Sequence, residues 1–232
     1  YLCLWYRFKQ FFYGYGGKMN IKSYSQSAQD IFVVSVLDRK RNGTYLEIGS
    51  AVPVENNNTY LLESEFDWTG ISFELNEELN ESFRSIRKNP VISGDATLHD
   101  YTKLIEENNL PTHIDYLQID IDPYWQSFKC LKAIDFDKFE FSAITFEHDY
   151  WCGGSKERME SREILESKGY TRVISDVMDG AYSMEDWYVN EKFVSKTWKE
   201  FVNQSIDQGT IRNDLMNHLK QFDYQTVWWY TA

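Results

Sequence analysis

The sequence predicts an α/β three-layer sandwich, and three observations support that class. Segments typical of strands and of helices alternate from residue 27 to residue 178, as in domains whose helices cover both faces of a largely parallel sheet. Within this stretch, residues 44–74 have the pattern strand, loop, helix, strand, a unit whose two strands run parallel. The chain has 232 residues and no low-complexity linker, which suits one domain with terminal extensions.

The individual elements follow from apolar periodicity and from boundary residues. In the first half we expect a helix in 27–37, a strand at 44–48, a helix from residue 60 capped by Asn58, a strand at 71–74, a helix in 75–89 and a strand ending near Asp95. In the second half we expect a helix in 99–109, strands in 114–122 and 142–150, a helix in 161–167 and strands in 171–177 and 184–189. Two apolar helical faces predict two further helices within residues 196–223.

An acidic residue ends each strand of the first strand–helix–strand unit. In sheets of this kind ligands bind beyond the carboxyl ends of the strands, which is where Glu47 and Glu74 fall. The intervening loop has a single glycine, Gly49, instead of the G-x-G-x-x-G that a dinucleotide pyrophosphate requires. A ligand with an amino-acid end and a ribose, such as S-adenosylmethionine, requires less of the loop. We therefore predict that Glu74 accepts hydrogen bonds from two ribose hydroxyls.

The composition narrows the class of partner. The net charge is −12, and such a surface repels phosphate backbones, so we expect no nucleic-acid partner. The three cysteines lack the close spacing of a zinc site and indicate thiols in a reducing, cytoplasmic compartment.

The first 18 residues differ from the rest, because they contain three basic and no acidic residues. Arg7, Lys9 and Gln10 interrupt their apolar run, so we expect no membrane-spanning helix. The segment either packs on the domain or makes a peripheral membrane contact. Met19 is an alternative start of the chain.

Six segments in order extend the prediction: SQSAQD (25–30), YLEIGSAVPVENNNTYLLE (45–63), WTGISFE (68–74), IDYLQIDID (114–122), ITFEHD (144–149) and EDWYV (185–189). Together they resemble the FkbM-type methyltransferases, a branch of the class I S-adenosylmethionine-dependent methyltransferases. The resemblance covers about residues 23–194 and implies a Rossmann-like, mostly parallel seven-stranded sheet with one antiparallel strand. Residues 1–22 then form an N-terminal extension, and residues 195–232 form a C-terminal helical extension packed on the domain.

The resemblance also implies site roles. It places Glu47 and Gly49 against the methionine part of the cofactor, Glu74 at the ribose, and Asp95 with Ala96 at the adenine. Further candidate cofactor contacts in the matching segments are Gln29, Ser50, Asn58 and Asp120. The chain departs from the family at Asp122-Pro123, where the family has Glu-Gly, and in the loop at 51–54.

Proton acceptors gather after the two central strands, at Asp120 and Asp122 and at Glu147, His148 and Asp149. Methyl transfer to an alcohol needs a base near the methyl group. We predict His148, Asp120 and Asp122 as catalytic residues, with His148 as general base because its side chain titrates near neutral pH. Asp120, Asp122 and Glu147, together with Asp149, are also candidate Mg²⁺ ligands, since carboxylate oxygens suit that ion.

Three functions are compatible with this pattern. The leading one is O-methylation of a hydroxyl on a sugar, glycan or secondary metabolite, with aromatic residues such as Tyr124, Trp125, Tyr150 and Trp151 stacking on a ring of the acceptor. The second is N-methylation, because Asp122-Pro123-Tyr124-Trp125 is similar to the D-P-P-aromatic element of amine methyltransferases. The third is a binding protein that keeps the fold without catalysis.

Overall fold

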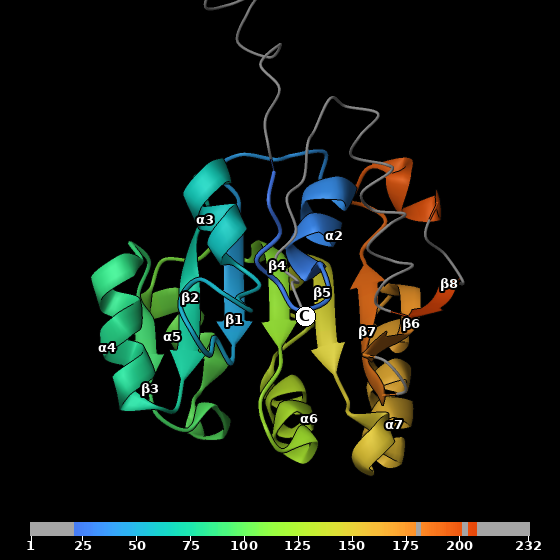
Figure 1. The fold of residues 1–232 in the computed structure, drawn as a ribbon. Coiled ribbons are helices and arrows are strands. Elements are labelled where there is room, and N and C mark those ends of the chain that lie inside the picture. The colour runs from blue at the N-terminus through green and yellow to red at the C-terminus, as the bar shows by residue number, and fades with distance from the viewer. Residues whose placement is uncertain (1–20, 180–181, 201–203, 208–232) are drawn as a thin grey trace, which may run out of the picture.

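A computed structural model describes residues 21–179, 182–200 and 204–207 (Figure 1). Their strands form one sheet in the order β3-β2-β1-β4-β5-β7-β6-β8. The strands are β1 (Thr44–Ile48), β2 (Thr69–Glu74), β3 (Val91–Ser93), β4 (His113–Ile119), β5 (Glu140–Glu147), β6 (Thr171–Asp179), β7 (Tyr182–Val189) and β8 (Gln204–Asp207). The first five are parallel to their neighbours, and β7 runs antiparallel to both β5 and β6.

The predicted fold class is therefore confirmed. Strands β1 to β7 form the expected mostly parallel, seven-stranded sheet with one antiparallel strand. The short strand β8 extends that sheet by pairing in parallel with β6. All five parallel strands β1 to β5 end at the lower edge of the sheet in Figure 1, which places their carboxyl ends side by side.

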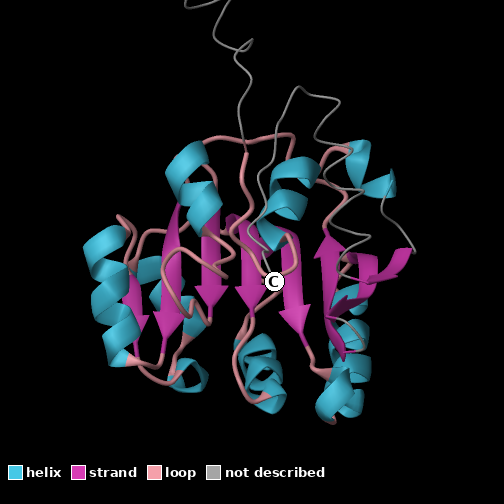
Figure 2. Cartoon of the chain, in the orientation of Figure 1, coloured by secondary structure: helices cyan, strands magenta, loops and turns pink. Residues whose placement is uncertain are grey.

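Helices cover both faces of the sheet (Figure 2). The α-helices are α2 (Gln29–Val36), α3 (Tyr60–Phe66), α4 (Glu77–Ile86), α5 (Tyr101–Glu107), α6 (Tyr124–Ala133) and α7 (Ser155–Ser167), and the 3-10 turns are η1 (Ala96–Leu98), η2 (Tyr150–Cys152) and η3 (Lys196–Glu200). Helices α2 and α3 pack in one buried apolar cluster, and α5, α6 and α7 pack in a second cluster on the opposite face.

The alternation of side chains along β1 shows how the sheet supplies both clusters. Tyr45 belongs to the cluster beneath α2 and α3, whereas Leu46 and Ile48 belong to the other one. Successive strand residues point to opposite faces, so a sheet buried on both sides needs near-continuous apolar strands. This requirement explains why the strands stand out so clearly in the sequence.

Local signals set the helix boundaries, with one correction. Asn76 caps α4 by accepting from the amides of Glu78 and Leu79. At α3, however, the predicted cap Asn58 is wrong: Asn57 Oδ1 accepts from the Tyr60 amide at 2.7 Å instead. The side chain of Asn58 therefore does not cap α3.

The C-terminal segment also differs from expectation where it is described. Residues 204–207 form a strand, not the predicted helix, because their backbone pairs with the edge strand β6. Residues 196–200 of the predicted helices form the 3-10 turn η3, and residues 201–203, 208–223 and 1–20 lie outside the described residues. No helix in the described part of the chain is both long and apolar enough to cross a membrane.

Candidate functional site

A cleft of about 700 Å³ opens at the carboxyl edge of the parallel strands. Loops after β1, β2, β3, β4 and β5 and the start of β7 form its walls. The described lining residues are Gln26, Gly49, Ala51, Asn56, Asn58, Phe73, Glu74, Leu75, Gly94, Asp95, Ala96, Asp120, Ile121, Asp122, Gln126, Glu147, Asp149, Trp151, Tyr182 and Met184. The volume is in the range of small-molecule and cofactor sites.

The charge of this cleft is one-sided. Six of the described lining residues are carboxylic acids, and none is lysine, arginine or histidine. Such a lining repels phosphate groups and attracts cations. The cleft therefore suits a ligand with positive charge next to neutral, hydrogen-bonding parts.

Gly49 lies where β1 and β4 come closest at the edge of the cleft. Its φ is +91°, and a Cβ added there would lie 1.8 Å from the backbone oxygen of Asp120. Both the backbone conformation and the contact exclude other residues. The Gly49 and Ser50 amides donate to Phe73 O at 3.1 and 2.9 Å, so the turn is fixed against the end of β2.

Glu74 ends β2 at the wall of the cleft. Its Oε2 accepts from the Ala51 amide at 2.9 Å, and its Oε1 accepts from the Asn76 amide at 2.8 Å. Each oxygen of a carboxylate can accept a second hydrogen bond. The side chain is thus held in place with acceptor capacity left for a ligand.

Asp95 and Ala96 follow β3 and line the same part of the cleft. Asp95 Oδ1 accepts from the Thr97 amide at 2.8 Å, and this bonding lowers the pKa of the Asp95 carboxyl. The acids after β2 and β3 therefore lie in one half of the cleft, as the sequence predicts.

A buried arginine organises the loop between β1 and α3. Arg87 is 1% exposed in its side chain and pairs with Glu63 at 2.8 Å. Its guanidinium also donates to Pro53 O, Asn57 Oδ1, Tyr45 OH and Thr59 Oγ1 at 3.0–3.2 Å. These bonds hold residues 53–59 against α4.

Asn58, on that loop, lines the cleft and is 7% exposed. Its Oδ1 has no hydrogen-bond partner. A buried amide oxygen is seldom left unpaired, so this atom is suited to accept from a ligand.

Glu47 lies behind the cleft wall rather than in it. The side chain is fully buried, and its Oε2 accepts from Ser72 Oγ at 2.6 Å and Thr59 Oγ1 at 2.9 Å. Burial raises the pKa of Glu47, against the opposing effect of Arg87. Glu47 thus supports the loop that carries Asn58, and it is not among the described residues that line the cleft.

Asp120 and Glu147 face each other at the ends of β4 and β5. Burial raises the pKa of both carboxyls; their hydrogen bond and mutual repulsion couple the two groups. Two adjacent buried carboxyls do not both ionise readily. The pair is therefore suited to take up a proton at the cleft floor.

Asp122 and Asp149 complete the acidic floor. One carboxylate oxygen each of Asp122, Glu147 and Asp149 lies within 4.8 Å of the others, a geometry that a divalent cation could use. These are three of the four predicted ligands, and Asp120 is not in the set. Burial raises the pKa of Asp149 even though Trp151 Nε1 donates to its Oδ1 at 2.8 Å.

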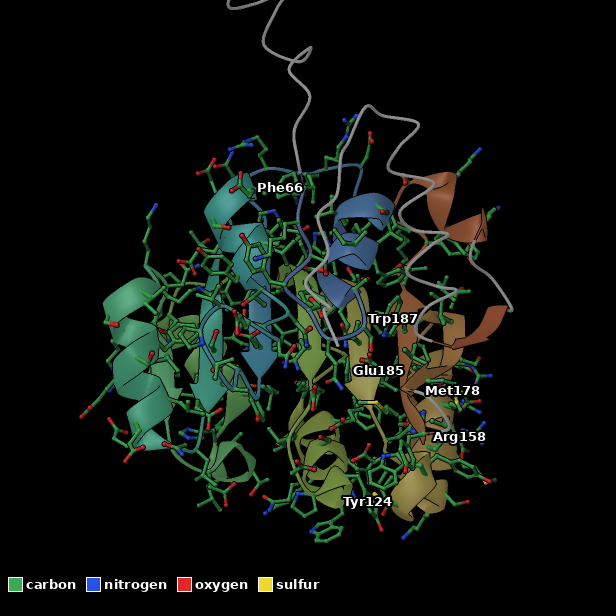
Figure 3. All side chains as sticks on the ribbon, viewed as in Figure 1. Phe66, Tyr124, Arg158, Met178, Glu185 and Trp187 are labelled. Atoms are coloured by element: carbon green, nitrogen blue, oxygen red, sulfur yellow. The ribbon has the colours of Figure 1, made fainter. Side chains whose placement is uncertain are left out.

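Two aromatic rings flank the floor at the cleft mouth. Trp151 and Tyr182 are 51% and 53% exposed, and their ring centroids lie 4.7 Å apart. Tyr124 lies at the same end of the molecule, opposite Phe66 (Figure 3). The sequence indicated Trp151 as a ring-stacking residue, but it gave no reason to choose Tyr182, which joins the site only through the β6–β7 hairpin.

Besides Glu47, three predicted site residues lie outside the cleft lining. His148 is fully buried and faces β6 and β7, so it does not reach the space where a general base is needed. Gln29 Nε2 donates to Glu185 Oε1 at 2.6 Å beneath the cleft, while its neighbour Gln26 lines it. Ser50 is 2% exposed, with an unpartnered Oγ.

No family model and no curated protein matches this chain. Among solved structures, it is similar to an O-methyltransferase from Bacillus cereus in complex with SAH, with 16% identity and a TM-score of 0.48 over 74% of this chain and 84% of that one. It is also similar to a fibrillarin from Aeropyrum pernix bound to S-adenosyl-L-methionine, with 15% identity and a TM-score of 0.47 over 71% and 74%. A putative rRNA methylase from Clostridium thermocellum has 12% identity and a TM-score of 0.46 over 74% and 97%. Similarity at this level assigns neither a substrate nor a cofactor, and the FkbM branch stays a prediction.

Proposed function

We propose that the protein is an S-adenosylmethionine-dependent methyltransferase. The observation that carries the proposal is the cleft at the strand ends, with six carboxylic acids and no cationic side chain among its described lining residues. A sulfonium and an ammonium group are favoured there, whereas the pyrophosphate of a dinucleotide is repelled.

The residues present fit this cofactor. Glu74 is suited to accept from the two ribose hydroxyls, because both its oxygens keep acceptor capacity beside the cleft. The unpartnered Oδ1 of Asn58 is suited to accept from the ammonium of the amino-acid end. Asp95 and Ala96 are the proposed contacts of the adenine. Gly49 lets the chain pass without a side chain in this space.

Bound S-adenosylmethionine would supply an activated methyl group, so the protein has to orient the acceptor and accept its proton. We assign the proton acceptor to the Asp120–Glu147 pair. Its carboxyls lie at the cleft floor, and burial raises the pKa of both, which makes the pair a stronger proton acceptor than an exposed carboxylate. Asp122 and Asp149 would bind polar groups of the acceptor. We do not assign this role to His148, because its side chain faces away from the cleft.

The proposed acceptor is a hydroxyl of a sugar, glycan or secondary metabolite. The exposed rings of Trp151 and Tyr182 support a ring-shaped acceptor, because they can pack against its faces at the cleft mouth. N-methylation is the second candidate. Asp122 is exposed beside these rings, and a carboxylate next to aromatic faces also suits an ammonium group.

Calorimetry with S-adenosylmethionine and S-adenosylhomocysteine tests the proposal. Glu74→Ala should weaken binding by about 1.5–3 kcal/mol, or roughly one to two decades, since it removes a charged hydrogen-bond acceptor. Glu77→Ala is the matched control, because Glu77 lies three residues away, is exposed and carries the same charge. The proposal fails if the wild type binds neither compound, or if both variants bind alike. Binding without methyl transfer to any hydroxyl or amine would favour the non-catalytic alternative.

A further inference from the structure

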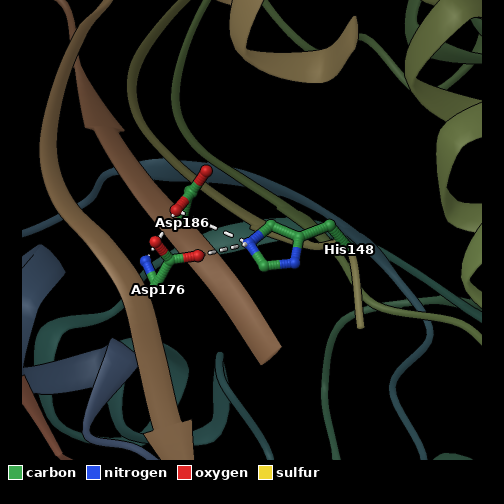
Figure 4. Close-up of side chains that lie close together, drawn as sticks. All are labelled: His148, Asp176 and Asp186. Carbon is green, nitrogen blue, oxygen red and sulfur yellow. Dashed lines mark hydrogen bonds and ion pairs between the residues drawn. The ribbon is translucent and has the colours of Figure 1, made fainter. Parts of the chain in front are cut away.

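A partly buried charged cluster lies where β6, β7 and α7 meet the end of β5. It consists of His148, Asp176, Asp186 and the guanidinium groups of Arg158 and Arg162. Figure 4 shows the imidazole of His148 directed at the two carboxylates. The proposed chemistry uses none of these side chains, although His148 stands between two cleft residues in the sequence.

The two carboxylates already have full partners without the histidine. Arg162 donates to both oxygens of Asp186 at 2.6 and 2.8 Å, and Arg158 binds both oxygens of Asp176. His148 Nε2, in contrast, lies 3.5 Å from Asp186 and 3.8 Å from Asp176. These distances exceed those of a hydrogen bond. One ligand atom each of His148, Asp176 and Asp186 lies within 4.8 Å of the others, but the positive charge of the two arginines beside both carboxylates disfavours a metal ion there.

The hydrogen bond that His148 does make lies on its other nitrogen. The Tyr150 amide donates to His148 Nδ1 at 3.2 Å. In this bond Nδ1 is the acceptor, and Nε2 is the ring nitrogen that faces Asp186 and Asp176.

That bond holds the turn that supplies part of the cleft. The amides of His148 and Asp149 both donate to Met184 O, at 2.8 and 2.9 Å, and Asp149 has a left-handed φ of +46°. The chain then enters η2, where Trp151 Nε1 donates to Asp149 Oδ1. Asp149 and Trp151 line the cleft, while the imidazole lies on the opposite side of the same turn.

The turn also packs closely against Gly154, at the start of α7. A Cβ on Gly154 would lie 1.7 Å from His148 O. The backbone therefore has no room to shift toward α7. The hydrogen bond from the Tyr150 amide to His148 Nδ1 restrains the turn on its other side. The turn is therefore held from both sides.

We propose that His148 is a positioning residue whose Nδ1, by binding the Tyr150 amide, sets Asp149 and Trp151 in the acceptor half of the cleft. This proposal deepens the proposed function and rests on it, because that function makes the side of the cleft with Asp149 and Trp151 the place where the methyl acceptor binds.

Two substitutions at His148 distinguish the role of Nδ1 from the role of Nε2. In His148→Asn the amide oxygen takes the place of Nδ1, so the acceptor for Tyr150 is kept; in His148→Gln the amide nitrogen takes the place of Nε2, so only the donor is kept. His113→Asn is the matched control. His113 binds Ser142 and stacks on Phe193 at the amino end of β4, which is the opposite edge of the sheet.

The main readout is the indole N–H signal of Trp151 in nitrogen-15 correlated spectra, assigned with Trp151→Phe. We expect His148→Asn and His113→Asn to leave this signal at its wild-type position and His148→Gln to displace it. Binding of S-adenosylhomocysteine should stay within about threefold of wild type in all three. A purely structural role would lower the melting temperature of both His148 variants without this difference.

The proposal is overturned if the Asn and Gln variants displace the signal equally, or if Gln alone preserves it. Should both fail to fold, the ring nitrogen-15 shifts of His148 in the wild type decide: hydrogen on Nε2 agrees, and hydrogen on Nδ1 refutes it. Failure of the proposed function has a different signature. In that case the wild type does not bind S-adenosylhomocysteine, while the Trp151 signal still reports on the turn.

Discussion

Replacing Arg87 by methionine should destabilise the protein more than any surface substitution on the same helix. The guanidinium of Arg87 makes five hydrogen bonds from an almost fully buried position. Methionine fills much of the same space but donates to none of these oxygens. Glu63, 7% exposed, would then be a buried carboxylate without its cation.

Breaking a buried ion pair by removing one partner costs about 3–5 kcal/mol. For a chain of this size each kcal/mol lowers the melting temperature by about 2–4 °C, which gives a loss of roughly 6–20 °C. Urea unfolding at neutral pH measures the free energy directly, and thermal unfolding checks the shift. Arg84→Met is the control, because Arg84 is 47% exposed and pairs with an exposed Glu77. It should change the free energy by about 0–1 kcal/mol.

A second substitution tests the reason given for this loss. Glu63→Gln in the Arg87→Met background removes the uncompensated charge while keeping an acceptor for the Lys88 amide. The double variant should therefore be more stable than Arg87→Met alone. A loss below about 1 kcal/mol for Arg87→Met, or a double variant no better than the single one, would refute the reasoning.

Three further predictions concern the site and the chain ends. Gly49→Ala should abolish cofactor binding and lower the melting temperature, because its Cβ would overlap Asp120 O; calorimetry showing wild-type affinity would contradict this. Burial raises the pKa of Glu147, so the stability that its proton contributes is complete below the ordinary glutamate pKa and is lost as pH rises through the raised pKa. Glu147→Gln should therefore stabilise the fold at pH 8 more than at pH 4.5, by at most about 1.4 kcal/mol per pH unit. A difference in the free energy of urea unfolding that does not depend on pH would count against this prediction. A chain starting at Met19 should fold and bind cofactor like the full chain, because the family-like pattern begins only around Ser25. Aggregation or lost cofactor affinity would show that residues 1–18 belong to the domain. If the shortened chain no longer sediments with anionic liposomes while the full chain does, the membrane contact is favoured.

Most of the fold could be predicted from the sequence, because strands buried on both faces are continuously apolar. Residues 44–48 and 71–74 are instead short β-prone runs that contain Glu47 and Ser72, and turn-forming glycines mark their limits; the observed strands are 44–48 and 69–74. The strand at 204–207 could not be found in the same way. It exists because the edge of β6 offers backbone partners, and such a tertiary contact overrides the helical spacing of its side chains.

The site was predictable where topology alone decides it. Glu74 and Asp95 line the cleft because they follow parallel strands whose carboxyl ends share one edge. The positions of His148 and Glu47 depend instead on which side of a strand or turn a side chain takes, and this is set by packing. Asp149 adopts a left-handed conformation that turns its own side chain into the cleft and leaves His148 outside. Nothing in a single sequence signals that turn.

The one-sided charge of the cleft has a consequence for how the protein responds to its medium. Carboxylates crowded in a hollow attract sodium, potassium or magnesium ions from solution, and these form a loosely held population of counter-ions. A cationic ligand has to displace them on entry. Its apparent affinity therefore falls as ionic strength rises, while that of an uncharged analogue changes little. The salt concentration of the medium therefore changes how strongly the cleft prefers a cationic ligand over an uncharged ligand of the same shape.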